Sequence, residues 1–326
     1  MRIFNKTAVL AAVTSLIIMT GCSSDNDEPA EDSPEMMPLS VGIIPIGTMS
    51  AIPYGIEQGI FEEHGLDVTI STGGGGAAML PALQSGDLDV VIGNAANLLQ
   101  AVEQGIDMRV ISGYSSSRPE GLDVNGVVVD SDSDIETWAD LEGKSVAVNA
   151  VRGQGDVTIM ESVAEDGGDP DAVSFVELAF PDMQAQMELG NVDAIWVPEP
   201  FLDTAVNDDG HRLLGHPNQI IPGLPTVVSF TDGATIEENA ELISRYQAAM
   251  SDLLEQFMAD ESGKIEATMD FIEAPEEVAK LSIERDVFDA EIPEDAIRSL
   301  NEIMLKYGFL TEDPITDEFF YHPAVQ

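Results

Sequence analysis

The chain has 326 residues, of which 13 are Lys or Arg and 60 are Asp or Glu, so its formal net charge is −47 at pH 7. A polyanion of this size is repelled by nucleic acid and by anionic membrane surfaces, which argues against nucleic acid as a partner and against electrostatic binding to such membranes. The length allows two modest domains or one large one, each with ample core. We interpret the acidic excess as a solvated shell, with a trap for cations as the alternative.

Residues 1–22 have the pattern of a signal peptide. Arg2 and Lys6 precede an apolar run from Ala8 to Met19, and Thr-Gly-Cys follows it. The run is too short to span a membrane, and small residues after it are typical of a cleavage site. Cys22 is the only cysteine, which excludes an intrachain disulfide.

The segment from Ile18 to Cys22 resembles the bacterial lipobox, with Met where Leu is more usual. We therefore predict that Cys22 is lipidated, and more than one acyl chain would anchor the protein stably. An inert core thiol is the alternative. Residues 23–38 are acidic, of low complexity and interrupted by proline, which predicts a disordered tether.

A strand followed by a polar loop and a helix opens the folded part. Residues 41–46 are apolar and β-branched enough for a buried strand, and Pro53 suits the first turn of a helix. Ile52, Ile56 and Ile60 recur at helical spacing, and Gly65 indicates the end of that helix. Such a loop leaves N–H groups unpaired at the helix start and suits an anionic ligand.

The same unit recurs along the chain. We predict further strands at residues 66–71, 89–93, 108–114, 126–129, 145–149, 173–177 and 193–197. Helices are predicted at residues 77–85, 94–104 and 155–166, with one ending at Leu189 and one starting at Phe201. This alternation predicts an α/β fold with mostly parallel sheets covered by helices.

The second half of this pattern repeats the first. Residues 83–97 align with residues 187–201 at an offset of 104, and residues 41–50 align with residues 146–155 at an offset of 105. We infer two similar lobes that each present loops at the carboxyl ends of their strands. Ligands of open α/β sheets bind at those ends, so two facing rims predict a cleft.

The tail after Pro225 is mostly helical. A strand is predicted at residues 226–231, and helices at residues 236–258, 264–272, 275–284 and 293–307. We expect the tail to pack back on the first lobe, so that two crossings near residues 126–129 and 225–228 form a hinge. The predicted division is lobe 1 at 39–127 and 226–326, and lobe 2 at 128–225.

Several segments together resemble the substrate-binding proteins of ABC importers for nitrate, sulfonates, taurine and thiamine precursors. They are IPYGIEQGIFEEHGLDVTI at 52–70, GGGG at 73–76, LQSGDLDVVIGNAAN at 83–97, WADLEGK at 138–144 and VDAIWVPEPF at 192–201. The resemblance covers residues 39–230 well and the tail weakly. It implies a two-lobed type II periplasmic-binding-protein fold, hinge closure on a small solute, and delivery to a permease with its ATPase.

Candidate ligand contacts in lobe 1 lie at the predicted strand ends. Thr48, Met49 and Ser50 offer hydroxyls and amides to the cleft, with N-capping as the alternative role. Asn94 and Asn97 flank the start of a helix, where one of them is expected to be a cap.

The glycine run supplies further candidates, Gly75, Gly76 and Ala77. Residues 73–78 have the spacing of a dinucleotide fingerprint, but they follow the second strand and lack the acidic residue expected about twenty positions later. Four glycines allow the backbone to approach a ligand closely, or form a bare turn. Tyr114 is a candidate aromatic of the cleft, or ordinary core.

In lobe 2, Arg152 stands out because cations are scarce. It suits bidentate binding of a carboxylate or sulfonate, or a weak surface ion pair. Gln154 and Gly155 share its loop. Asp182 and Glu199 occupy the next two rim positions, where they either cap helices or receive an ammonium group.

Enzymatic motifs are weak. Residues 143–145 resemble the end of a P-loop but lack its first glycine, and there is no G-x-S-x-G elbow. The four histidines form no i, i+4 pair for zinc. We therefore predict no catalytic residue, no cofactor and no metal. The pyrimidine synthases of thiamine biosynthesis resemble this family and are the enzymatic alternative, but the chain lacks their cysteine-rich motif.

We predict a monomeric, extracytoplasmic, lipid-anchored receptor that serves a permease and its ATPase. The first choice of ligand is a small polar or anionic solute such as a sulfonate, taurine or nitrate. A heterocyclic precursor of thiamine or riboflavin is the second choice. A ligand-binding sensor that serves no permease is a further alternative.

Overall fold

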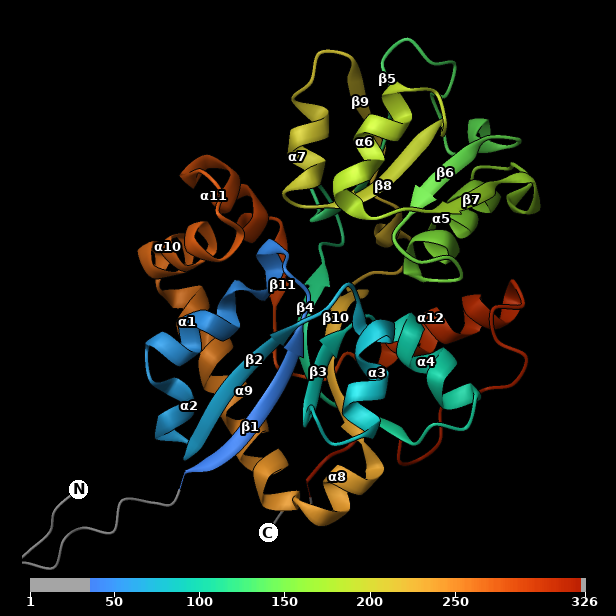
Figure 1. Cartoon of the computed structure of the whole chain (residues 1–326). Coiled ribbons are helices and arrows are strands. Elements are labelled where there is room, and N and C mark those ends of the chain that lie inside the picture. The colour runs from blue at the N-terminus through green and yellow to red at the C-terminus, as the bar shows by residue number, and fades with distance from the viewer. Residues whose placement is uncertain (1–35, 324–326) are drawn as a thin grey trace, which may run out of the picture. The chain divides into compact units, whose positions relative to one another are not determined.

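The computed structural model describes residues 36–323, without the side chain of Ala77. The predicted signal peptide, Cys22 and residues 23–35 of the predicted tether lie outside this range. Residues 37 and 38, also assigned to the tether, already belong to the first strand. The described part forms two lobes, each built on its own β-sheet (Figure 1).

The sheet of lobe 1 has six strands in the order β11-β4-β10-β3-β1-β2. They are β1 (Met37–Ile43), β2 (Leu66–Thr72), β3 (Val90–Gly93), β4 (Met108–Ser117), β10 (Pro225–Asp232) and β11 (Asp286–Phe288). Strands β2, β1 and β3 pair in parallel, whereas β10 pairs antiparallel with both β3 and β4. The tail therefore returns to lobe 1 by inserting a strand into its sheet.

The sheet of lobe 2 has five strands in the order β7-β6-β8-β5-β9. They are β5 (Asn125–Asp130), β6 (Ser145–Val148), β7 (Ser174–Glu177), β8 (Ala194–Pro198) and β9 (His211–Gly215). Strands β7, β6 and β8 are parallel, and β5 pairs antiparallel with β8 and β9. The two-lobed α/β fold is confirmed, but the sheets are mixed rather than mostly parallel.

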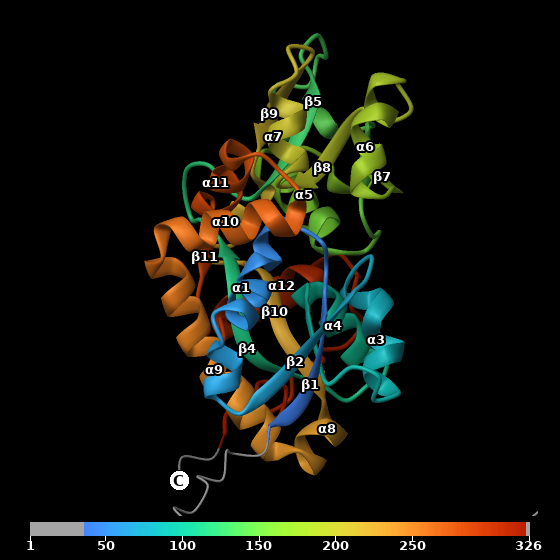
Figure 2. The same ribbon diagram turned by 60° about the vertical axis from the view of Figure 1, so that its left-hand side comes forward.

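Helices cover both faces of each sheet (Figures 1 and 2). In lobe 1, α1 (Ala51–Glu57), α2 (Ile60–Glu63) and α9 (Ala240–Ala259) bury one face. The other face is covered by α3 (Gly76–Gln84), α4 (Ala95–Glu103) and α12 (Glu294–Lys306). In lobe 2, α5 (Gln154–Glu165) lies on one face, and α6 (Phe180–Glu188) and α7 (Phe201–Val206) lie on the other.

The remaining helices extend lobe 1. They are α8 (Gly233–Glu238), α10 (Glu261–Ile272) and α11 (Glu276–Glu284). Four short 3₁₀ helices complete the described part: η1 (Gly47–Ser50), η2 (Ala139–Leu141), η3 (Pro170–Ala172) and η4 (Pro217–Ile220). Both views place α10 beside α1 and next to α11 (Figure 2).

The internal repeat extends to a matching pair of polar contacts. Ser40 of β1 donates to the carboxylate of Asp89, the residue before β3, from its backbone N at 2.7 Å and from its Oγ at 2.6 Å. The Ser40 Oγ also accepts the Asp89 N–H at 3.1 Å. Ser145 and Asp193 make the same three contacts at the same distances in lobe 2. We call these two arrangements the Ser–Asp clasps, and they tie corresponding strands together in each lobe.

Several predicted boundaries differ from the observed ones. Strand β1 covers residues 37–43 rather than 41–46, because its seven residues pair in register with β2. The helix expected up to residue 65 is broken at Gly59, whose φ of 74° is left-handed and suits glycine. Strands β9 and β11 were not predicted, since each is short and is stabilised by its neighbour in the sheet.

The chain crosses between the lobes in two linkers, at residues 118–124 and 216–224, a few residues before the predicted crossings. The predicted division after residue 127 falls inside β5. None of the helices within residues 36–323 combines the length and apolar character needed to cross a membrane.

We predict that Ser40→Ala destabilises the protein by about 1–2 kcal/mol, because it removes two hydrogen bonds of the clasp from a half-buried position. Ser145→Ala should cost less, since Asp193 is exposed and water can replace its partner. Denaturant unfolding measures both. Ser174→Ala is the control, an exposed serine of β7, and a loss as large as that of Ser40→Ala would contradict the role given to the clasp.

Candidate functional site

A cavity of about 60 Å³ lies between the lobes, where the carboxyl ends of the parallel strands meet. At about 10–15 Å³ per water-sized sphere, it has room for a few such spheres. From lobe 1 and the starts of β5 and β10, the lining comprises Ile44, Ile46, Thr48, Asn94, Asn97, Val124, Asn125, Thr226 and Val227. From lobe 2 it comprises Asn149, Ala150, Gly153, Gln154, Phe180, Trp196 and Pro198.

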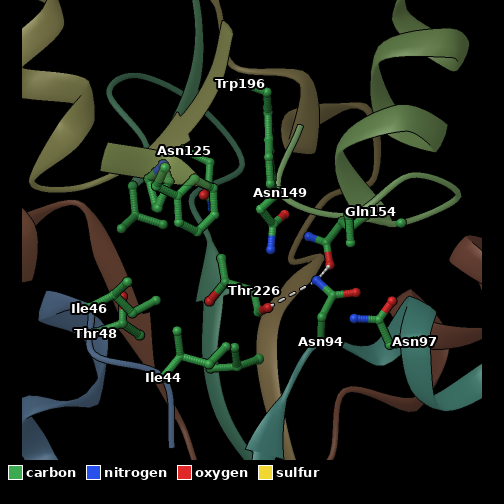
Figure 3. A pocket seen from close by; sticks show the side chains of 16 residues that line it. Ile44, Ile46, Thr48, Asn94, Asn97, Asn125, Asn149, Gln154, Trp196 and Thr226 are labelled. Atoms are coloured by element: carbon green, nitrogen blue, oxygen red, sulfur yellow. Dashed lines mark hydrogen bonds between the residues drawn. The ribbon is translucent and has the colours of Figure 1, made fainter. Parts of the chain in front are cut away.

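Three asparagines present free carboxamides to this cavity (Figure 3). The side chains of Asn97, Asn125 and Asn149 make no hydrogen bond to any residue in the range 36–323. Each carboxamide offers two donors and an acceptor oxygen. They come from three different elements, so a solute in the cavity has polar partners from both lobes.

Two other predicted contacts, Asn94 and Gln154, bridge the lobes at the cavity wall (Figure 3). The Asn94 oxygen caps α4 by accepting the Ala96 N–H at 2.9 Å. Its amide nitrogen donates to the Gln154 side-chain oxygen and, at 3.3 Å, to the Thr226 carbonyl oxygen. Asn94 is therefore a helix cap, and it also lies in the cavity wall.

The lining contains no ionisable side chain. Instead, two helices begin at the cavity, α4 after its cap Asn94 and α5 after Gly153. The N-terminal end of a helix carries a partial positive charge and free N–H groups, which attract a negatively charged or strongly polar group. The end of α4 has no acidic residue in its first turn, whereas the first turn of α5 contains the buried Asp156. The site can therefore bind an anion without a basic side chain.

Trp196 and Phe180 form an apolar side of the cavity, with their ring centres 6.2 Å apart. Trp196 is 6 % exposed, and its indole N–H has no acceptor within the described range. The predicted contact Gly155 lies behind this ring rather than in the lining. A Cβ atom at Gly155 would lie 2.9 Å from the Trp196 ring, so glycine there lets the ring occupy its place.

Arg152 does not line the cavity, contrary to the clamp suggested from sequence. Its guanidinium donates to the carbonyl oxygens of Gly308 and Phe309, at 3.0 and 2.7 Å, and lies 5.1 Å from the centre of the Phe309 ring. These partners follow α12 in lobe 1, so Arg152 connects the lobes. Both carbonyls belong to the loop after α12, where a guanidinium can donate to two neighbouring oxygens at once.

Glu199 also acts between the lobes rather than in the cavity. It is buried, pairs with Arg285 at the end of α11, and accepts the Asp203 N–H of α7 at 3.1 Å. Of the two roles suggested by the sequence, this carboxylate has that of a helix cap, and it also forms an ion pair. Asp182 is exposed in the first turn of α6 and is absent from the lining.

The other candidates support the wall or lie elsewhere. Met49 belongs to the core of lobe 1, and Ser50 shares a hydrogen bond of 2.7 Å with Thr268. Tyr114 is buried, and its hydroxyl donates to the carbonyl oxygen of Thr48 at 3.0 Å. Tyr114 thus positions the one residue of the Thr48–Ser50 segment that reaches the cavity.

The glycine run is not part of the lining. Gly75 precedes α3, and Gly76 opens it. A Cβ atom at Gly76 would lie 3.3 Å from the Cα of Gly93, so the run serves close packing of α3 on β3. The side chain of Ala77 lies outside the described part.

Sequence reasoning missed Asn125, Asn149, Phe180, Trp196 and Thr226. Asn149 directly follows β6, as Asn94 follows β3, so the same rule would have found it. Asn125 and Thr226 come from the starts of antiparallel strands, which only the pairing of β5 and β10 brings to this edge.

A second group lies apart from the cavity. Glu188, Asp208 and one ring nitrogen of His211 lie within 4.8 Å of one another. The sequence did not indicate it, because the three residues come from different segments: Glu188 ends α6, Asp208 follows α7 and His211 begins β9. Glu188 and Asp208 are exposed, and neighbouring carboxylates are expected in so acidic a chain, so this group alone indicates no metal site.

Solved structures share the fold at low sequence identity. The alkanesulfonate-binding protein SsuA from Xanthomonas axonopodis pv. citri, bound to MOPS, matches with a TM-score of 0.74 at 16% identity, over 88% of this chain and 99% of that one. The ligand-binding component of an ABC-type import system from Staphylococcus aureus, with zinc bound, matches with a TM-score of 0.73 at 13% identity, over 89% of this chain and 97% of that one. The periplasmic nitrate-binding protein NrtA from Synechocystis matches with a TM-score of 0.68 at 15% identity, over 86% of this chain and 83% of that one.

Sequence comparison gives the family. No curated protein matches the chain in sequence. Residues 48–262, more than half of the chain, match the family described as NMT1/THI5 like. The segments singled out from the sequence, from the first helix to the rim loops of lobe 2, fall largely in this range. The chain therefore belongs to the NMT1/THI5-like family.

Proposed function

We propose that the protein is the solute-binding component of an ABC importer, which closes its lobes on a small polar solute and presents the closed form to a permease and its ATPase. The observation that carries this proposal is the cavity between the lobes, with free carboxamides from both sides. The names of the similar structures, two anion-binding proteins and an ABC import component, support it.

The composition of the lining favours an organic solute with a polar or anionic group. The ends of α4 and α5 and the carboxamides suit the polar group. Ile44, Ile46, Phe180 and Trp196 offer an apolar surface that a nitrate ion would leave unused. We therefore rank a small sulfonate such as taurine first. A heterocyclic vitamin precursor is second, because the aromatic side of the cavity suits a ring.

The lining favours binding over catalysis. Its only groups that could exchange a proton or act as a nucleophile are the hydroxyls of Thr48 and Thr226. The Thr226 hydroxyl already bonds to Ser115. A pyrimidine-synthase-like activity would need acid, base or covalent chemistry at this place, and the residues of the lining do not supply it.

We also propose that Cys22 carries the lipid anchor and that residues 23–36 connect it to lobe 1. The lipobox-like segment and the small residues before Cys22 support this. Mass spectrometry of the N-terminal peptide from the exported protein tests this proposal. We expect a peptide whose first residue is an acylated Cys22. An unmodified peptide that begins before residue 22 would contradict it.

We predict that a lipid-free form binds a small alkanesulfonate such as taurine. Asn149→Ala should weaken binding about tenfold, because it removes a hydrogen bond to a charged or strongly polar group. Trp138→Phe leaves Trp196 as the only tryptophan, so its fluorescence reports events in the cavity. Titration calorimetry gives the affinity independently.

Asn191→Ala is the control for this titration, since Asn191 is exposed and absent from the lining. It should bind like the parent protein. If the heterocyclic precursors bind and the sulfonates do not, the order of ligand classes is reversed. If no solute of either class binds, or if Asn149→Ala changes nothing, the cavity is not the binding site.

The closed form depends on contacts between the lobes, of which the Glu199–Arg285 pair is the most buried. We predict that Arg285→Met lowers the free energy of unfolding by about 3–5 kcal/mol, because it leaves the Glu199 carboxylate buried without a partner. Adding Glu199→Met should recover part of the loss, since both charges are then gone. Denaturant unfolding gives these values.

Solute affinity should fall in Arg285→Met as well, because the closed form loses a contact that the open form lacks. Lys280→Met is the control, since its ion pair with Glu276 is exposed and lies within α11. The role of the Glu199–Arg285 pair would be contradicted if the Arg285→Met protein were as stable as the Lys280→Met protein and bound the solute as tightly.

A further inference from the structure

A buried polar cluster lies between the two linkers, outside the lining of the solute cavity. The linkers are joined there, since the Gln219 side chain donates to the Gly121 carbonyl oxygen at 2.9 Å. Asp123 in the first linker is 0 % exposed, Asn218 in the second is 0 % exposed, and Asp286 in β11 is 2 % exposed. Two acids thus lie in the interior at the place where the lobes connect.

These side chains converge on Ser117 at the end of β4. Asp286 is paired with Ser117 across antiparallel strands, so both side chains lie on one face of the sheet. The Ser117 hydroxyl accepts the Asn218 amide at 3.0 Å and lies beside the Asp123 carboxyl. Burial, and to a smaller degree the Asp123 carboxyl, raise the pKa of Asp286.

Four oxygen atoms of this cluster are buried without a donor from residues 36–323. They are Asp123 Oδ2, both carboxyl oxygens of Asp286 and Asn218 Oδ1. The hydroxyls of Thr48 and Ser115 lie beside Asp286, but neither makes a hydrogen bond of good geometry with it. Such groups normally have a donor, an ordered water or an ion as partner.

Nearby basic groups do not supply the missing charge. Arg285, next in sequence to Asp286, is paired with Glu199. The ring of His216 accepts the Asp123 N–H at 3.4 Å on Nε2 and bonds the Asn125 carbonyl oxygen at 2.6 Å through Nδ1, so both ring nitrogens already have partners. The cluster is therefore a set of buried oxygen atoms that includes two carboxyl groups.

We propose that Asp123, Asp286 and Asn218, with the Ser117 hydroxyl, bind a hard metal cation between the linkers. Carboxylate and amide oxygens are the ligands of such ions, and two carboxylates match a divalent charge. Ca²⁺ suits the site better than Mg²⁺, because it accepts irregular sets of oxygen ligands. Burial raises the pKa of Asp286 to about 7, so a bound cation would have to displace a proton from it near neutral pH.

The cation site is distinct from the proposed solute site but adjoins it. Val124 and Thr48 line the solute cavity, and they neighbour Asp123 and Asp286 respectively. A cation that fixes both linkers against β4 and β11 would favour one angle between the lobes. Solute and cation would then affect each other's affinity by the same factor.

The test uses the full chain, treated with a chelator and then melted at pH 8 with Ca²⁺, Mg²⁺ or K⁺ at matched ionic strength. Matching is needed because every cation screens a net charge of −47. We expect Ca²⁺ to raise the midpoint by several degrees more than K⁺, and calorimetry to give one strong site. Asp286→Asn and Asp123→Asn should each lower that affinity at least tenfold.

Asp208→Asn is the matched control, because Asp208 belongs to the exposed Glu188–Asp208–His211 group. It should keep the strong site. If the Asp286 variant does not fold, Asn218→Ala replaces it, since it removes an uncharged ligand and should also weaken binding. Equal midpoints in all salts, or a strong site lost in Asp208→Asn and kept in Asn218→Ala, would overturn the proposal. A midpoint that responds to pH but to no cation would assign the cluster to a proton instead.

Discussion

Parallel pairing joins β2, β1 and β3 in one sheet and β7, β6 and β8 in the other, and this pairing decides where the polar loop residues lie. It sends the carboxyl ends of β1, β3, β6, β7 and β8 to facing edges, and each following loop or helix then begins at the same cavity. Helix N-termini and polar loop residues gather there without any special sequence motif. The antiparallel strands β5 and β10 add their first residues to the same edge, because they run the opposite way.

Three of the few basic residues lie on contacts between the lobes. Arg152 binds carbonyls after α12, Arg285 pairs with Glu199, and Lys306 pairs with Glu161 at 2.6 Å. Only 13 Lys and Arg are available against 60 acids. In a protein with this net charge, two lobes repel each other as they approach. Basic residues at the contact offset that repulsion and leave the cavity free of charged side chains.

As a result, the uncharged and the charged side chains near the cavity have different roles. A solute meets uncharged donors and acceptors, whereas the charged groups hold the protein's own parts together. Carboxamides bind both donors and acceptors, so the lining does not by itself require a negative ligand. The two helix ends give the preference for a polar or anionic group, and the aromatic side of the cavity gives the preference for an organic one.

Sequence periodicity and the internal offset were enough to predict the two-lobed fold, because each strand–loop–helix unit is encoded locally. The same reasoning placed Thr48, Asn94, Asn97 and Gln154 at the cavity, since polar residues after parallel strands share one edge.

It could not decide between the alternative roles of Arg152, Glu199 and Tyr114, because these roles depend on partners far away in the chain. Strand β11 and Arg285, the partner of Glu199, both come from the tail. The return of the tail to lobe 1 was expected, but its pairing with the strands of that lobe could not be predicted. No local pattern in the tail indicated which of its residues would face the other lobe.

Enclosure of a solute between the lobes requires one lobe to move against the other. Small-angle X-ray scattering of the lipid-free protein, with and without a saturating solute, measures this movement. We expect a smaller radius of gyration with the solute, and a weaker contraction in Arg285→Met at the same solute concentration. An unchanged radius in the presence of a bound solute would contradict it.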